Sequence, residues 1–253
     1  IIRKDIRIND TVYVKRAGDV IPEIDRVSII DRKKSIEIIM PKKCPSCKAS
    51  LIKVPGQSTY KCPNEYNCSP QIIQSIQHFA SRKAMNISGL GESLIEMMVN
   101  NHIIKNYTDL YILDVKSLLN LDRMALKSST NLIDSINKSK NISFDRFLYS
   151  LGIREVGTST ARVLAKSFST IESLMNTDKI QLEMIKDIGP IVGENIYKFF
   201  KLKKNKDNIS KLIKNGIHII YSEASIVQEY NGMTFVVTGV FDNYKRKDIE
   251  DRI

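Results

Sequence analysis

LGIREVGTSTARVL (residues 151–164) comes close to the phosphate-binding loop of nucleotide-binding proteins. Gly152, four further residues and Gly157 satisfy the first part of the Walker A pattern G-x-x-x-x-G-K-[ST], but Thr158 stands where that pattern requires lysine. Three interpretations are open: a damaged nucleotide site, a plain turn between helices, or another kind of phosphate cradle. The rest of the sequence separates them.

The same local pattern recurs along residues 72–200. Each copy has an apolar residue, Gly or Ala, three residues, a residue that is usually small, two residues, and an apolar residue. The Gly or Ala positions are Gly91, Ala125, Gly157 and Gly189, so successive copies are 34, 32 and 32 residues apart. A period in this range indicates a repeated supersecondary unit, and the helical spacing of the flanking apolar residues makes it helix, hairpin, helix.

A helix-hairpin-helix unit can hold a phosphate. We expect the Gly before each second helix to adopt a positive φ and to allow close approach of a ligand. The unpaired N–H groups and the dipole of that helix would bind one phosphate, and four units would follow a nucleic-acid backbone without reading its bases. The candidate DNA-binding residues are Gly89, Gly91, Lys127, Gly152, Arg154, Gly157, Thr158, Gly189 and Gly193.

Basic residues near the hairpins could add phosphate contacts, or could be solvated surface charges: Arg82, Lys83 and Arg162, besides Lys127 and Arg154. Ala125 replaces Gly in the second unit, which we expect to keep its packing and to lose its phosphate contact. The alternative to DNA binding is a helical array for protein contacts. Tetratricopeptide repeats have a similar period, but they carry aromatic and Ala positions that this chain lacks and need no Gly at the turn.

Composition agrees with a nucleic-acid partner. The 253 residues include 39 Lys and Arg against 28 Asp and Glu, a formal net charge of +11. The sequence has no apolar run of about 18 residues and no export signal, so we expect no membrane association. The three histidines, His78, His102 and His218, have no catalytic partners at a telling spacing and are interpreted as structural.

All four cysteines fall in one short window. Cys44 and Cys47 are separated by two residues, Cys62 follows after fourteen more, and Cys68 after another five. Two cysteine pairs joined by a short loop can place four sulfurs at the corners of a tetrahedron, as zinc requires. A redox C-x-x-C or four unrelated thiols are the alternatives. Clustering in a chain otherwise free of cysteine points to a reducing compartment and to structural zinc.

The two ends of the chain show β patterns. Val12 and Val14, a turn, then Val20 and Ile21 predict strand, turn, strand, and residues 35–40 predict a third strand; together they fit a partial small barrel such as an oligonucleotide-binding (OB) fold. Near the other end, "TFVVT" (residues 234–238) predicts a buried strand that runs through Gly239 into a basic helix, the start of an α/β module. Both ends look cut, which suggests a piece of a longer protein.

The order of these parts resembles the NAD-dependent DNA ligases of bacteria. "VYVKRAGDVIPEI" is similar to the late part of their OB domain, and the four cysteines match their zinc motif. "HFASRKAMNISGLGE", "FLYSLGIREVG" and "IGP" resemble their helix-hairpin-helix domain, and "GMTFVVTG" the first strand of their BRCT domain. The resemblance covers essentially the whole chain.

The resemblance implies a multi-domain, mainly α protein. Its parts would be a partial OB domain (1–41), a four-cysteine zinc finger (42–70), a helix-hairpin-helix domain of four repeats (71–220), a linker (221–230) and the start of a BRCT domain (231–253). The implied activity is sealing of 3′-hydroxyl/5′-phosphate nicks in duplex DNA by a cytoplasmic, monomeric enzyme. NAD adenylates a lysine in a K-x-D-G motif, with Mg²⁺ as a second cofactor; this motif is absent here, so we expect both cofactors to bind outside these residues. A non-enzymatic DNA-binding module is the alternative.

Overall fold

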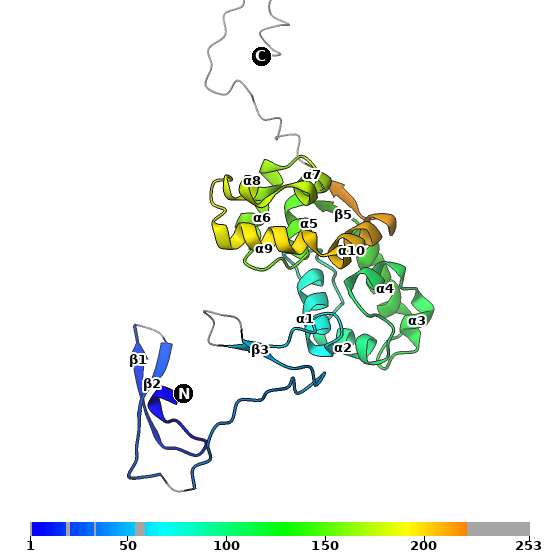
Figure 1. Cartoon of the computed structure of the whole chain (residues 1–253). Coiled ribbons are helices and arrows are strands. Elements are labelled where there is room, and N and C mark those ends of the chain that lie inside the picture. The colour runs from blue at the N-terminus through cyan, green and yellow to red at the C-terminus, as the bar shows by residue number, and fades with distance from the viewer. Residues whose placement is uncertain (1, 19–20, 33, 54–58, 222–253) are drawn as a thin grey trace, which may run out of the picture. The chain divides into compact units, whose positions relative to one another are not determined.

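The computed structural model describes residues 2–18, 21–32, 34–53 and 59–221 (Figure 1). The chain divides into two units, Ile1–Cys68 and Ser69–Ile253. The predicted linker and the start of the BRCT domain, at 222–253, lie outside the described residues. Among those described, no helix is long and apolar enough to cross a membrane.

The first unit begins with a small antiparallel sheet. After a short 3-10 helix, η1 (Ile2–Lys4), strand β1 (Val12–Ala17) pairs with β2 (Ile21–Val27), and the register shifts between Tyr13 and Val14. The third strand predicted at 35–40 is reduced to one bridge between Ile8 and Ile36. The described residues of this unit therefore form two-stranded sheets and no closed barrel.

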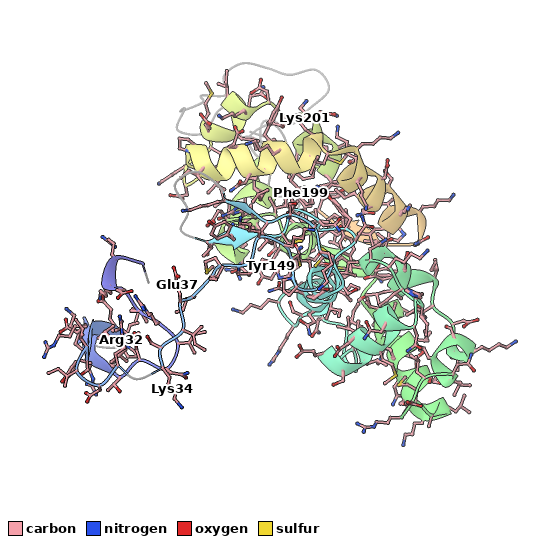
Figure 2. All side chains as sticks on the ribbon, turned by 60° about the horizontal axis from the view of Figure 1, so that its bottom comes forward. Arg32, Lys34, Glu37, Tyr149, Phe199 and Lys201 are labelled. Atoms are coloured by element: carbon pink, nitrogen blue, oxygen red, sulfur yellow. The ribbon has the colours of Figure 1, made fainter. Side chains whose placement is uncertain are left out.

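Polar contacts, rather than an apolar core, hold this sheet module together. Arg32, labelled in Figure 2, donates hydrogen bonds to the carboxylates of Asp10 at 2.8 Å and Asp5 at 2.6 Å. Ile30, close to Arg32 in sequence, is 95% exposed. Strands β3 (Ile52–Lys53) and β4 (Tyr60–Lys61) then form a second antiparallel pair, within the cysteine-bearing segment.

The second unit is built from helices, as the repeats predict. Four consecutive helix pairs carry the four copies of the sequence pattern. They are α1 (Ser69–Ala80) with α2 (Glu92–Asn100), α3 (Val115–Leu119) with α4 (Leu126–Lys138), α5 (Phe144–Ser150) with α6 (Thr158–Ser167), and α8 (Lys179–Glu183) with α9 (Pro190–Lys201).

Five further elements belong to the described part of this unit. A 3-10 helix, η2 (Tyr107–Ile112), joins the first two pairs, and α7 (Ile171–Asn176) joins the last two. Helix α10 (Lys203–Lys214) follows the fourth pair. Strand β6 (His218–Ile220) then returns to pair in parallel with β5 (Asn141–Ser143), so the end of the unit is tied to its middle (Figure 1).

The regular spacing within each copy is explained by the core. The residue four positions after each Gly or Ala is buried in all four units, and so is the residue seven positions after it. The first set is Ile95, Ser129, Ala161 and Gly193, and the second is Met98, Leu132, Leu164 and Ile196. Positions four and seven residues on lie on one face of a helix, so each second helix presents the same face to the core.

Gly193 allows α9 to cross α8 closely. A Cβ atom built at Gly193 would lie 3.1 Å from Cγ of Glu183 and 3.7 Å from Cβ of Leu182. We therefore expect Gly193→Leu to force these helices apart and to lower the free energy of unfolding by about 1–3 kcal/mol. Thermal or denaturant unfolding followed by circular dichroism measures this loss.

The matched control is Ile191→Phe, which adds volume on the same helix at a side chain that is 74% exposed. It should leave the unfolding midpoint close to that of the wild type. Equal stability of the Gly193→Leu and control variants would contradict the assigned role of Gly193.

Candidate nucleic-acid interface and metal-binding cysteines

The four hairpins share one backbone geometry, which differs from the predicted one. The residue before each second helix has an extended conformation: φ is −82° at Gly91, −112° at Ala125, −83° at Gly157 and −80° at Gly189. The prediction of a positive φ at these glycines is therefore wrong. A residue that caps the start of a helix sits in the β region while its carbonyl accepts the first helical hydrogen bond, and a positive φ has no place there.

The positive φ lies two residues earlier in every hairpin. It is 85° at Gly89, 64° at Arg123, 63° at Glu155 and 70° at Asp187. This is where the chain reverses between the two helices of each pair. Three of these four residues are not glycine and adopt a backbone conformation that L-residues seldom use, so glycine content alone could not reveal the shared turn.

The first turn of each second helix has no capping side chain. The N–H of Ala161 bonds to the carbonyl of Gly157 at 2.9 Å, and the same bond starts α2, α4 and α9 at 2.9–3.0 Å. Gly and Ala carry no side-chain oxygen, so these residues offer no acceptor to the N–H groups of the first helical turn. In α9 the first helical residue, Pro190, has no N–H group at all. In contrast, α3, α7 and α8 are capped by Asp114, Thr170 and Asp178.

The glycines at these bare helix ends are not required by the fold. A Cβ atom at Gly91, Gly157 or Gly189 would meet nothing within 4 Å, and their φ values suit any residue. What glycine does provide is an uncovered helix N-terminus, where N–H groups and the helix dipole favour an anion. The second hairpin differs because the Ser128 hydroxyl accepts a bond from the Ala125 N–H at 2.9 Å.

The other predicted residues fall into three settings. Thr158 and Lys127 lie in the first turns of α6 and α4, at the hairpin surface. Arg154 lies in the third hairpin with its side chain 49% exposed and its Nε 3.8 Å from Glu155. Gly152, with φ of 66°, ends α5 beside the His78 ring, and Gly193 is buried between helices. The last two can affect binding only through the shape of the hairpins.

The structure brings together basic residues that are distant in sequence. Arg82 and Lys83 follow α1, yet they line the same pocket as Thr158 and Arg162 of the third hairpin. Arg146 of α5 lines it too, and the sequence analysis did not single it out. Only the packing of α1 against α5 reveals this group, and no spacing along the chain could have predicted it.

The four cysteine sulfurs form a compact cluster. All Sγ atoms lie within 4.8 Å of one another, with 3.9 Å between Cys44 and Cys68 and 3.4 Å between Cys47 and Cys62. Four sulfurs bound tetrahedrally to zinc at about 2.3 Å would be about 3.8 Å apart. The cluster therefore fits a tetrahedral metal ion and could hold one.

Backbone hydrogen bonds aim the first cysteine pair. The Cys44 N–H donates to the Ala49 carbonyl at 2.8 Å and the Lys48 N–H donates to the Cys44 carbonyl at 3.0 Å, which closes a tight loop. Hydrogen bonding from the backbone of Ala49 lowers the pKa of the Cys47 thiol, whereas, despite a backbone hydrogen bond from Asn64, burial and the neighbouring Cys47 sulfur raise the pKa of Cys62. A depressed pKa favours the thiolate, which is the form that binds a metal.

The second cysteine pair is positioned by a similar turn. The Cys68 N–H donates to the Asn64 carbonyl at 3.0 Å, directly before α1 begins. Cys44 and Cys68 are 6% and 3% exposed, whereas Cys47 and Cys62 are half-buried. Cysteines with these exposures and sulfur positions form one site, which lies within the first unit of the chain.

Comparisons with known proteins agree with the helix-hairpin-helix repeats. The family described as the helix-hairpin-helix motif matches residues 146–209, which span the third and fourth hairpins. Three relatives named DNA ligase are 43% identical over 252 residues (Coxiella burnetii, strain RSA 493 / Nine Mile phase I), 44% over 255 (Nitrosococcus oceani) and 40% over 253 (Flavobacterium psychrophilum).

These matches cover 98–99% of this chain but 37–38% of each relative. The chain thus spans less than two fifths of the length of the curated relatives it matches.

The sulfur cluster predicts one bound metal ion per chain. Cys68→Ser removes the most buried of the four ligands, so we expect loss of the metal and unfolding of the segment around it. Metal content measured by mass spectrometry on the purified protein, together with limited proteolysis, checks both effects.

Ser46→Ala, which changes a non-ligand residue in the same loop, serves as the control and should keep the metal. A wild-type protein that binds no metal after purification without chelators, or a Cys68→Ser variant that retains it, would refute the site.

Proposed function

We propose, on the premise that the chain is homologous along nearly its whole length to one part of bacterial DNA ligases, that it is the DNA-clamping portion of an NAD-dependent ligase. In such an enzyme it would hold nicked duplex DNA by the phosphate backbone. The ligase reaction would join a 3′-hydroxyl to a 5′-phosphate. The protein would act on DNA in the bacterial cytoplasm, and it would be a monomer.

One observation carries the proposal: the four hairpins share one geometry, and three of them, before α2, α6 and α9, present helix N-termini that no side chain caps. A single bare helix end can bind one anion, and a series of them suits a polymer of phosphates. The formal charge of +11 adds a sequence-independent attraction to DNA. Because the contacts are to the backbone, we expect binding without base preference.

Catalysis would lie in another part of the ligase. No K-x-D-G motif occurs in the 253 residues, so the adenylated lysine, NAD and Mg²⁺ would be held elsewhere. The four cysteines would hold a structural Zn²⁺, since four sulfur ligands leave no position for water. Residues 1–41 and 231–253 would belong to the OB and BRCT domains of the enzyme.

The alternative is a DNA-binding module that takes no part in ligation. The coding sequence on the 5′ side discriminates between the two, because a ligase requires K-x-D-G in the same reading frame.

The hairpin mechanism can be tested with a substitution that leaves the helix well capped. Gly157→Asp places a carboxylate over the first turn of α6, where it accepts the N–H bonds itself and repels phosphate. We expect the helix to remain stable and the Kd for nicked duplex to rise about ten-fold, the equivalent of about 1.4 kcal/mol. Fluorescence anisotropy with a labelled nicked duplex gives the Kd.

Ala125→Asp is the matched control, since it adds the same charge at the hairpin that we expect to have lost its phosphate contact. Its Kd should stay within about two-fold of the wild type, because a lone surface charge contributes little. Equal weakening by both substitutions would show general charge repulsion, and no weakening by Gly157→Asp would refute phosphate binding at the third hairpin.

The absence of the K-x-D-G lysine from these 253 residues predicts that the chain binds DNA without sealing it. The 253-residue chain with NAD and Mg²⁺ should bind nicked duplex and leave the nick open, since the nucleophilic lysine of the reaction is absent. A denaturing gel of the labelled strand detects sealing, with a complete NAD-dependent ligase as the positive control. Sealing by the chain alone would contradict this assignment.

A further inference from the structure

The third hairpin lies beside a basic pocket that the repeat pattern does not explain. The pocket has a volume of about 360 Å³, and four cationic side chains, one carboxylate, Tyr149 and Thr158 line it. The cationic side chains are Arg82, Lys83, Arg146 and Arg162. With Asp145 as the one acid among the lining residues, the formal charge of the wall is +3, from four positive groups less one negative group.

The pocket is held in shape by hydrogen bonds between α1 and α5. Arg146 donates from Nη2 to the carbonyls of Arg82 at 2.9 Å and Ala84 at 2.7 Å, which fixes the segment that carries Arg82 and Lys83. His78 of α1 bonds through Nε2 to the carbonyl of Tyr149 at 2.7 Å. Tyr149 is labelled in Figure 2. These bonds fix the backbone around the pocket, and Arg82, Lys83 and Arg162 line it with exposed side chains.

Asp145 orients part of the wall without neutralising it. Its Oδ1 accepts a bond from the Ser143 hydroxyl at 2.6 Å, and its Oδ2 lies 3.8 Å from Nε of Arg162. The Arg162 side chain is still 69% exposed, so its guanidinium remains accessible to a ligand. Arg82 and Lys83 are exposed as well.

We propose that this pocket binds a sugar–phosphate unit of the same DNA strand whose phosphate the first turn of α6 holds. Thr158, the first residue of α6, lines the pocket, so the uncapped helix end and the cationic wall adjoin. Arginine forks match phosphate oxygens, and the volume admits more than a phosphate group alone. The third hairpin then binds more than one phosphate, and the loop after α1 forms part of this binding site.

This inference rests on the proposed DNA binding and goes beyond it, because it assigns Arg82 and Lys83 to the third hairpin instead of the first. It also gives the third hairpin a larger share of the affinity than a bare helix end supplies.

The test is the salt dependence of DNA binding. Arg82→Gln combined with Arg162→Gln removes two cations from the wall and leaves Arg146, which holds the loop, in place. Each phosphate contact to B-DNA contributes about −0.9 to the slope of log K against log[salt], so the slope should become shallower by about 0.9–1.8. The control is Lys211→Gln with Lys214→Gln, which removes the same charge from exposed positions on α10, a helix outside the hairpins.

The results separate this inference from the proposed function. A wild-type protein that fails to bind duplex DNA refutes both. Normal binding by the wild type, with the pocket and control variants showing equal slopes, refutes the pocket alone.

Inorganic pyrophosphate distinguishes a free anion from a DNA strand. We expect it not to displace DNA at constant ionic strength. Pyrophosphate binding that depends on Arg82 and Arg162, with DNA binding unchanged in the double variant, would overturn the assignment to DNA.

Discussion

The N-termini of α2, α6 and α9, which no side chain caps, are the feature on which the proposed role of the second unit depends. A helix leaves its first N–H groups without an internal partner. Asp114, Thr170 and Asp178 supply one from the cap position of α3, α7 and α8, whereas α5 and α10 also begin without a side-chain cap. At three of the four hairpins glycine stands in that place, although neither φ nor crowding requires it. These helix starts leave exposed N–H groups open to an acceptor from outside the protein, which is what the proposed phosphate binding requires.

Holding these helix ends in position is the task of the core. The residues four and seven positions after each hairpin Gly or Ala are buried, so every second helix is fixed in rotation about its axis. Buried side chains sit in close-packed surroundings with few voids, so a fixed rotation also fixes where the first turn points. Packing in one repeat and the proposed phosphate binding at its hairpin therefore depend on the same helix placement, and a larger residue at position 193 would disturb both.

Much of this arrangement could be predicted from the sequence, because it depends on short-range spacing. The positions of Gly91, Ala125, Gly157 and Gly189 predict four hairpins, and the cysteine spacing predicts the sulfur cluster. The turn itself could not be predicted, since Arg123, Glu155 and Asp187 hold the positive φ through the constraints of the surrounding helices. The basic pocket could not be predicted from the sequence either, because helix packing brings residues 82–83 next to residues 145–162. The prediction of a third strand at 35–40 is wrong for a different reason: Ile39 is 81% exposed and has no core to pack against.

The lack of a core in the first unit gives the cysteine cluster its importance. None of the buried residues in the main hydrophobic cluster precedes Ile76, and among the described residues of the first unit the buried hydrophobic side chains are those of Cys44 and Cys68. A segment with so little buried apolar surface gains little from the hydrophobic effect to offset the entropy of ordering its backbone. Metal–sulfur bonds can supply that free energy directly, since the site forms only when the loops around it are folded. For this reason we expect a bound metal ion to be needed for the fold of the described residues around the four cysteines, 44–53 and 59–68.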